Sequence, residues 1–514
     1  MARDAAPHQP GPLRGCLDDL GSCEFDVVVI GGGIYGVCTA LEAARRGAKT
    51  ALVESDDFGG ATSWSSHRIV HGGLRYLQSL DLPRFTQSVR ERRWFLETMP
   101  TLIEPLECLM PLSGPGLKRP IAFRAALAIN AIGSRLVGGK TSALADGRVL
   151  SRRATLAAAP FVPERGLLGG GLWWDARMIS SERVLIVLLR AACEMGAVVS
   201  ARVRALRVLA EGGRVRGLSV ESADGSRRVD IAARAVINCA GSGVLDEALV
   251  PEQADRTKLF APARAFNLLL DVPPPTRSAI AVGGPARDAP TLFLVPMDGM
   301  LAAGTWHEPA EPTQGAMPTS ASIDRFLEEI RAAVPGLDVS AGDIRCVWSG
   351  LLPAHSPGKG EPSDRPVVLD HGRSGGSAGH VTVSGVKYTT ARLVAEQAVR
   401  RVFAGDRPAP VPVLQDPLGD LVLSTAMPSD RAVLIRLLER LRDEEQAVSP
   451  EDVLLRRTRW YLGEVTDAFV PAASQVFGLG ASSVERSLDD AAVLRLGPLI
   501  SGQAGTREGE CRWA

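Results

Sequence analysis

A short pattern near the N-terminus constrains the fold of this chain more than any other. The apolar run 27–30 leads directly into three glycines with the spacing GxGxxG: Gly31, Gly33 and Gly36. A helical pattern follows, and a second apolar run then ends at Glu54. This order predicts a buried parallel strand, a tight turn, a helix and a second parallel strand.

The glycine spacing has a physical explanation in nucleotide binding. The first glycine allows the tight turn, the second lets the backbone approach a pyrophosphate, and the third lets the helix pack closely on the strand. Glu54 lies about 20 residues further on, where a carboxylate accepts hydrogen bonds from a ribose. The pattern predicts a dinucleotide site; the alternative is a glycine-rich turn without a ligand. It does not distinguish FAD from NAD, but the small and hydroxyl residues after Glu54 suit a ligand that continues towards a flavin ring.

Length and charge exclude several classes of protein. A chain of 514 residues is expected to form two or three domains. The 58 basic and 58 acidic side chains balance, which argues against nucleic acid or a strongly anionic membrane as the main partner. The eight cysteines form no CxxC pair, so neither a disulfide framework nor a metal site is expected. Residues 1–22 lack an apolar signal-peptide core and are expected to be a disordered extension.

Two further segments place polar groups beside glycines. The segment HGGLRYL contains His71, Arg75 and Tyr76 around a double glycine that weakens any helix or strand. The late segment SGVKYTT contains Gly385, Lys387 and Thr389 immediately before a helical pattern.

The chain resembles the FAD-dependent glycerol-3-phosphate dehydrogenase family, within the D-amino-acid-oxidase-like flavoproteins. Four segments carry the resemblance: VVVIGGGIYG, GGATSWSSHRIVHGGLRYL, TVSGVKYTTARLVAEQAV and VSPEDVLLRRTRWYL. It implies an α/β fold with a Rossmann-like FAD-binding domain, a substrate (cap) domain on a mixed or antiparallel sheet, and a small C-terminal helical domain. It places residues 23–80, 160–255 and 340–405 in the FAD-binding domain, residues 81–159 and 256–339 in the cap, and residues 420–514 in the helical domain.

The resemblance also implies roles for individual residues. The implied catalytic residues are His71, Arg75 and Lys387. The implied substrate-binding residues are Arg75, Tyr76, Arg264 and Lys387. The implied FAD-binding residues are Gly31, Gly33, Gly36, Glu54, Thr62, Ser63, Val203, Gly241, Gly385 and Thr389. Structural alternatives stay open for three of them: a loop histidine at 71, a loop-fixing salt bridge at Arg75, and helix capping by the threonines that follow Lys387.

The chain departs from the family pattern in its substrate half. Leu352 stands where relatives carry an arginine expected to bind the substrate phosphate. Asn267 replaces a histidine, Arg264 stands at a lysine position, and Trp306 and His307 occupy a site that is usually small and acidic. A charge-assisted hydrogen bond is worth about 1.5–3 kcal/mol, so the loss of this arginine predicts about 10–150-fold weaker binding of a phosphorylated substrate. We expect Trp306 to reshape the pocket if its side chain points inward.

The leading hypothesis is a FAD enzyme that oxidises the carbinol of glycerol 3-phosphate, or a related small polyol phosphate, by hydride transfer to flavin N5. The electrons then pass to a quinone or another acceptor. The alternatives are a FAD enzyme for another hydroxy or amino substrate and a catalytically silent flavoprotein. A cytoplasmic location is expected. Peripheral contact with the inner face of the membrane, for which residues 121–140 are apolar enough, stays open beside a buried cap helix, as does a homodimer.

Overall fold

The structure is a computed structural model of the chain. It describes residues 7–77, 81–114, 118–138, 144–250, 259–283, 291–311, 315–405 and 407–496. Residues 1–6 of the expected extension and 497–514 of the expected helical domain lie outside these ranges, and the side chain of Arg75 is likewise not described. None of the described helices combines the length and the hydropathy of a membrane span.

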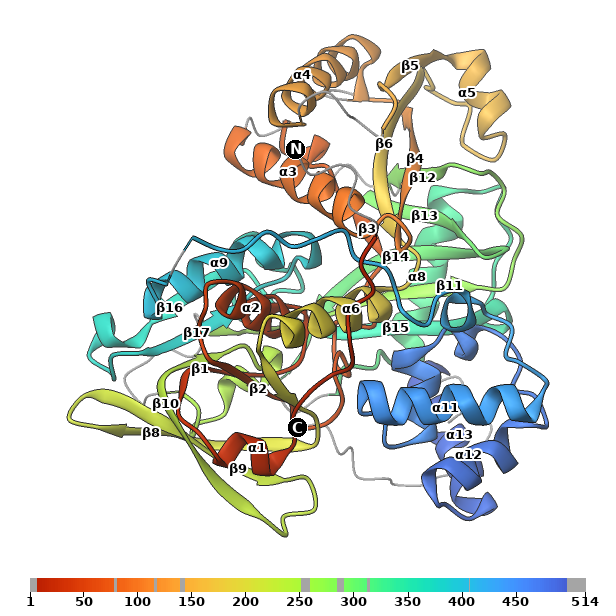
Figure 1. Cartoon of the computed structure of the whole chain (residues 1–514). Helices are drawn as coiled ribbons and strands as arrows, with labels where there is room; N and C mark the ends of the chain where they lie inside the picture. The colour runs from red at the N-terminus through yellow and green to blue at the C-terminus, as the bar shows by residue number, and fades with distance from the viewer. Residues whose placement is uncertain are drawn as a thin grey trace.

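The first sheet contains the dinucleotide-binding pattern (Figure 1). Its strands run in the order β16 (Val367–Asp370), β17 (His380–Ser384), β10 (Arg228–Asn238), β1 (Phe25–Ile30), β2 (Thr50–Val53) and β7 (Val198–Ser200). The strands from β17 to β7 pair in parallel, whereas β16 is antiparallel. The hairpin of β8 (Val203–Glu211) and β9 (Arg214–Ser222) continues from β10.

Both faces of β1 are buried, which explains its uninterrupted apolar run. Val27 and Val29 pack with α2 (Ile34–Arg45), α6 (Ser181–Glu194) and α9 (Ala391–Val402). Val28 and Ile30 pack on the opposite face, against β8 to β10.

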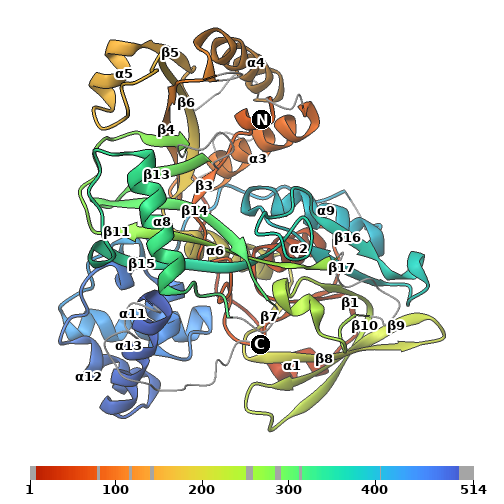
Figure 2. The same cartoon turned by 180° about the vertical axis from the view of Figure 1, so that it is seen from behind.

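The second sheet forms the cap. Its order is β15 (Ile344–Pro353), β11 (Pro262–Leu270), β14 (Met300–Pro309), β13 (Thr291–Met297), β12 (Ala279–Gly283), β4 (Ile103–Leu112), β6 (Gly169–Met178) and β3 (Ile69–Val70), with β5 (Arg148–Ser151) beside β6. The helix α8 (Ser320–Ala333) covers one face of this sheet (Figure 2). The helices α3 (Leu82–Thr98), α4 (Pro120–Gly138) and α5 (Arg152–Ala158) lie towards the β4 and β6 end.

A helical region completes the chain beside β15 (Figure 1). Its helices are α10 (Asp420–Leu423), α11 (Arg431–Glu445), the π-helix η7 (Asp452–Arg457), η8 (Trp460–Leu462), α12 (Phe469–Phe477) and α13 (Ala481–Leu496). The remaining helices are short: α1 (Leu17–Gly21), η1 (Leu74–Leu77), η3 (Gly241–Leu245), η4 (Ala341–Asp343), η5 (His371–Ser374) and η6 (Tyr388–Thr390). The expected fold class, an α/β cofactor domain with a mixed-sheet cap and a small helical domain, is confirmed.

The expected boundaries need correction in two places. The strands β3, β6 and β15 pair in the cap sheet, although the expected boundaries put their residues in the FAD-binding domain. An apolar strand does not reveal its partner, because the pairing is settled by non-local contacts. The expected extension is ordered from residue 7: Leu13 and Leu20 are buried, and His8 Nε2 lies 2.6 Å from a carboxylate oxygen of Glu194.

Candidate flavin site

The glycine turn has the shape that a pyrophosphate requires. Gly31 has a φ of +97°, and its amide donates to the carbonyl of Val53 at 2.8 Å. A Cβ on Gly36 would lie 1.8 Å from the carbonyl oxygen of Gly31, so only glycine lets α2 begin this close to the turn. Gly33 caps α2, and the next amide, of Ile34, donates to Ser63 Oγ at 3.0 Å. The N-terminus of α2 therefore lies directly at the glycine turn, where the helix dipole favours a phosphate anion.

Glu54 lies beside this turn at the end of β2. Its carboxylate accepts from the amides of Gly32 at 2.6 Å and Asp56 at 2.9 Å. Burial raises the pKa of Glu54, and the Gly32 amide opposes the shift. Its carbonyl accepts from the amide of Val203 at 2.8 Å, and Gly241, with a φ of +58°, follows the parallel strand β10. The predicted ribose and adenine contacts therefore gather at the carboxyl ends of neighbouring strands.

Three motifs that are far apart in the sequence meet at Lys387. The Tyr35 hydroxyl on α2 accepts from the Lys387 amide and donates to its carbonyl, each at 3.1 Å. A Cβ on Gly385 would lie 2.3 Å from that hydroxyl, which explains the glycine. Lys387 Nζ donates to the Tyr76 hydroxyl and lies 4.8 Å from the centre of its ring. The glycine-turn helix, HGGLRYL and SGVKYTT therefore converge.

The threonines after Lys387 lead into α9. Thr389 is buried in η6, and Thr390, the cap residue of α9, makes no side-chain capping hydrogen bond. The capping alternative is therefore wrong for Thr390.

His71 is held by a buried carboxylate that the sequence did not indicate. Its Nδ1 lies 3.4 Å from Asp175 Oδ2, and its side chain is 49% exposed. The same carboxylate accepts from Arg92 at 2.9 Å and from the Gly72 amide at 2.7 Å. Burial raises the pKa of Asp175, but the hydrogen bond from His71 and the charge of Arg92 outweigh it and lower the pKa to about 2. Asp175 is therefore ionised at neutral pH.

The cap sheet packs against the loop that contains Thr62. The Thr62 hydroxyl donates to the carbonyl of Leu351 at 3.1 Å, and a Cβ on Gly350 would lie 2.6 Å from the Thr62 side chain. Asn267 donates to the Ser65 carbonyl at 3.4 Å and accepts from the Thr305 hydroxyl at 2.8 Å. Leu352 is two residues from Gly350 on β15, so strand alternation puts it on the same face. Leu352 and Asn267 therefore belong to the face that covers the loop.

Arg264 and Trp306 point away from that face, which corrects two expectations. Arg264 donates to Glu308 at 2.7 Å and to the Gly315 carbonyl at 3.0 Å. The Trp306 ring packs on Phe326 of α8, with ring centres 5.4 Å apart. Arg264 therefore does not face Thr62, and Trp306 does not reshape that side of the cap. Strand phase decides both orientations, and a shift of one residue would reverse them.

Arg68 is part of the protein interior. It is fully buried and donates to Glu182 at 2.8 Å and to the Tyr461 hydroxyl at 2.6 Å. Asp57 is bound by Arg456 and Arg457 from the C-terminal region. These contacts were missed, although the adjacent arginines of RRTRWYL, in an otherwise apolar stretch, were an available signal.

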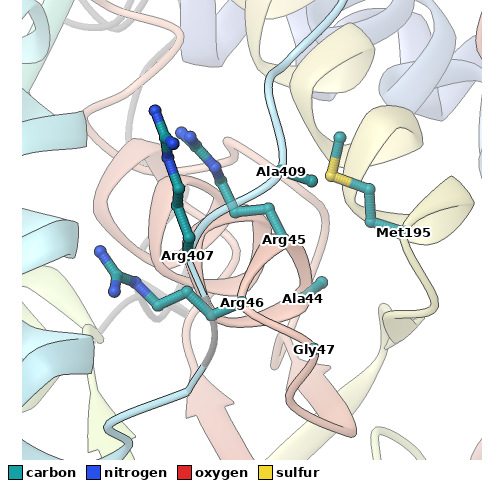
Figure 3. Close-up of a pocket in the computed structure, with 7 residues that line it drawn as sticks. All are labelled: Ala44, Arg45, Arg46, Gly47, Met195, Arg407 and Ala409. Atoms are coloured by element: carbon teal, nitrogen blue, oxygen red, sulfur yellow. The ribbon is translucent and has the colours of Figure 1, made fainter.

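A surface cleft lies away from these residues, at the C-terminal end of α2 (Figure 3). It is lined by Ala44, Arg45, Arg46, Gly47, Met195, Arg407 and Ala409. Arg45 and Arg407 extend in the same direction there. Glu42 pairs with Arg46 at 2.6 Å and with Arg45 at 3.4 Å. A helix C-terminus carries partial negative charge and stabilises cations. The position of Arg45 and Arg46 at the end of α2 therefore explains both arginines without a ligand.

Comparison with known proteins agrees with this geometry. Residues 26–401 match the family model described as FAD dependent oxidoreductase. The chain belongs to this family. The glycine turn, Glu54 and the close approach at Gly385 fit the FAD cofactor that gives this family its description.

Its relatives include glycerol-3-phosphate dehydrogenases. The chain is 30% identical over 389 residues to a probable mitochondrial glycerol-3-phosphate dehydrogenase of Caenorhabditis elegans, covering 74% of this chain and 52% of that protein. It is 31% identical over 388 residues to glycerol-3-phosphate dehydrogenase 2 of Mycobacterium tuberculosis, covering 74% of this chain and 63% of that protein. The chain thus spans only about half to two thirds of these relatives.

Among solved structures, the glycerol-3-phosphate dehydrogenase of Bacillus halodurans complexed with FAD has a TM-score of 0.69. It is 21% identical, and the match covers 94% of this chain and 97% of that one. This similarity confirms the fold.

Proposed function

We propose that this FAD-dependent oxidoreductase oxidises the secondary hydroxyl of glycerol 3-phosphate or a related small polyol phosphate. The observation that carries the proposal is the meeting of Lys387 and Tyr76, which joins HGGLRYL and SGVKYTT beside the glycine-turn helix. When bound, FAD supplies the hydride acceptor, N5 of its ring.

The side chains around this meeting point have distinct roles in the proposal. His71 accepts the proton from the substrate hydroxyl, because its ring is half exposed and its Nδ1 side is held by Asp175. Lys387 supplies positive charge beside the Tyr76 hydroxyl, where an anionic substrate and the reduced cofactor both need it. Arg75, whose main chain lies in η1, adds a second cation for the phosphate.

The strand alternation at Leu352 favours a second candidate. On its face of the cap, an apolar side chain stands where an anion-binding arginine is expected, and Asn267 lies on the same face. A hydroxy or amino substrate without a phosphate fits a cap face that carries Leu352 and Asn267. Trp306 does not support this candidate, because its ring packs on α8.

Anaerobic bleaching of the flavin tests the proposal. Glycerol 3-phosphate is expected to bleach the absorbance of the FAD-loaded protein, whereas glycerol at equal concentration does so much more slowly. Bleaching by a hydroxy or amino acid, but not by glycerol 3-phosphate, establishes the second candidate. No bleaching by any of these compounds, despite tight FAD binding, indicates a silent flavoprotein. The rate at which the reduced flavin is reoxidised then tests the acceptor. A soluble quinone analogue should reoxidise it faster than oxygen does if a quinone is the acceptor.

We also propose that α4 contacts a membrane surface, as a peripheral quinone-reducing enzyme requires. Ile121 is 82% exposed, and Ile129 and Ile132 are exposed at helical spacing on the same side of α4. Arg124 and Arg135 are exposed on that side as well. An apolar stripe with neighbouring cations is the composition of an interfacial helix.

A further inference from the structure

We propose that Asp175 is the positioning residue that makes His71 a proton acceptor, by fixing which ring nitrogen carries the hydrogen. This inference rests on the proposed function, in which His71 takes a proton from the substrate. No motif in the sequence singles out Asp175, which lies on the cap strand β6, 104 residues after His71.

Among the described residues, each hydrogen-bond partner of the Asp175 carboxylate is a donor. Oδ1 accepts from the Gly72 amide at 2.7 Å and from Arg92 Nη1 at 2.9 Å. Oδ2 accepts from Trp173 Nε1 at 3.2 Å and lies 3.4 Å from His71 Nδ1. An ionised carboxylate has no hydrogen to donate, so His71 Nδ1 must carry the hydrogen in this pair. In the neutral ring, Nε2 is then unprotonated and able to accept a proton.

The surroundings hold this pair in place. The Asp175 side chain is only 4% exposed, and Arg92 also donates to the Trp174 carbonyl at 2.8 Å. The His71 ring packs against Phe293, with ring centres 5.3 Å apart. A buried, fully hydrogen-bonded carboxylate orients an imidazole more firmly than a solvated one does.

The same geometry explains the double glycine. A Cβ on Gly72 would lie 1.9 Å from Arg92 Nη1 and 2.9 Å from Asp175 Oδ1. Gly73 has a φ of +83°, and its Cβ would lie 2.8 Å from the Cβ of Ser88. The two glycines therefore let the backbone come close enough for the Gly72 amide to share the carboxylate with His71.

Asp175→Asn tests the inference, because it preserves shape and reverses the two contacts of Oδ2, with His71 Nδ1 and with Trp173 Nε1. The amide oxygen of the asparagine must face Arg92 and the Gly72 amide, which can only donate. Its NH2 group then faces His71 Nδ1, so the ring has to accept there and carry its hydrogen on Nε2. The rate of flavin reduction by substrate is expected to fall about 10²–10⁴-fold, the range of general-base contributions. KM should stay within roughly threefold, since Lys387 and Arg75, the proposed cations for the substrate phosphate, are unchanged.

Trp173→Phe is the matched control. It removes the other hydrogen bond to Oδ2 but leaves the acceptor for His71, so flavin reduction should stay within roughly threefold of wild type. The pair His71→Asn and His71→Asn/Asp175→Asn completes a double-mutant cycle, in which the second substitution should have no further effect on the rate.

The ¹⁵N spectrum of His71 provides a readout that needs no substrate. The FAD-loaded wild type and Trp173→Phe should show the hydrogen on Nδ1, and Asp175→Asn should show it on Nε2. Hydrogen on Nδ1 in Asp175→Asn overturns the inference, and so do equal rate losses in Asp175→Asn and Trp173→Phe. If the hydrogen moves to Nε2 but His71→Asn reduces its flavin at the wild-type rate, the positioning stands and the base role in the proposed function is lost.

Discussion

Arg457, in the C-terminal helical region, binds the carboxylate of Asp57. Asp57 lies three residues after Glu54, the predicted ribose ligand. The two terminal nitrogens of Arg457 donate to the two carboxylate oxygens at 2.9 and 2.5 Å. Arg456 Nε donates to the same carboxylate at 2.7 Å, and all three side chains are buried. Burial raises the pKa of Asp57, and Arg457 and Arg456 oppose the shift. The C-terminal helical region therefore braces the loop that follows Glu54.

Removing this brace should destabilise the protein and weaken FAD binding together. Arg457→Met leaves Asp57 with one of its two cations, and breaking a buried pair costs about 3–5 kcal/mol. We expect a lower unfolding midpoint and a higher Kd for FAD, measured by thermal unfolding and by flavin fluorescence. Arg152→Met, in the exposed pair with Glu164, should change stability by only about 0–1 kcal/mol. Equal effects of the two substitutions would contradict the role of the brace.

Gly36→Ala should impair FAD binding selectively. The new methyl group would lie 1.8 Å from the Gly31 carbonyl oxygen, so the turn has to shift. Overpacking of this kind costs about 1–3 kcal/mol, which corresponds to about 5–150-fold in affinity for the cofactor. Gly342→Ala is the control, since its nearest neighbour would be 3.6 Å away. Titration with FAD separates the two, and wild-type affinity in Gly36→Ala would contradict the turn geometry.

Leu352→Arg should improve the use of a phosphorylated substrate. A charge-assisted hydrogen bond of about 1.5–3 kcal/mol predicts a KM for glycerol 3-phosphate that is lower by about tenfold or more. The neutral variant Leu352→Gln controls for size and should leave KM nearly unchanged. Steady-state kinetics with glycerol 3-phosphate and glycerol provide the measurement. Identical KM values for Leu352→Arg and Leu352→Gln would place the substrate phosphate elsewhere.

Two buried histidines should make the fold sensitive to mild acid. The rings of His371 and His380 lie 4.3 Å apart, and burial lowers their pKa values to about 4 and about 3. In the unfolded chain, histidine titrates near pH 6.5. As the pH falls from about 6.5 to about 4, the unfolded state therefore binds protons that the folded state does not, and stability falls.

Urea unfolding at pH 7.5 and pH 5.0 measures this loss, which we expect to be about 1–2 kcal/mol for each histidine. His380→Asn should reduce the difference between the two pH values. His355→Asn, at an exposed position, should leave it unchanged. The same difference in all three proteins would show that other groups cause the acid sensitivity.

The proposed membrane contact predicts that Ile121→Ser/Ile132→Ser reduces sedimentation with lipid vesicles. Burying an isoleucine side chain is worth about 1.5–3 kcal/mol, so losing two should weaken binding by tenfold or more, at roughly 1.4 kcal/mol per factor of ten. Val465→Ser changes an exposed apolar residue of the helical region and is the control. The FAD-loaded proteins should all reduce their flavin at the wild-type rate. Undiminished sedimentation of the double variant would exclude α4 as the contact.

The fold of the cofactor half of this protein follows from its local sequence. Strand, glycine turn, helix and acid are consecutive in the chain, so their spacing alone predicts how 27–54 fold and that they form a dinucleotide site. Tertiary structure alone decided the rest. Arg264 and Trp306 point away from the face that covers Thr62 because of strand phase, and a shift of one residue reverses a strand's faces. Asp175 meets His71, and Arg457 meets Asp57, across 104 and 400 residues, by packing that no local pattern records.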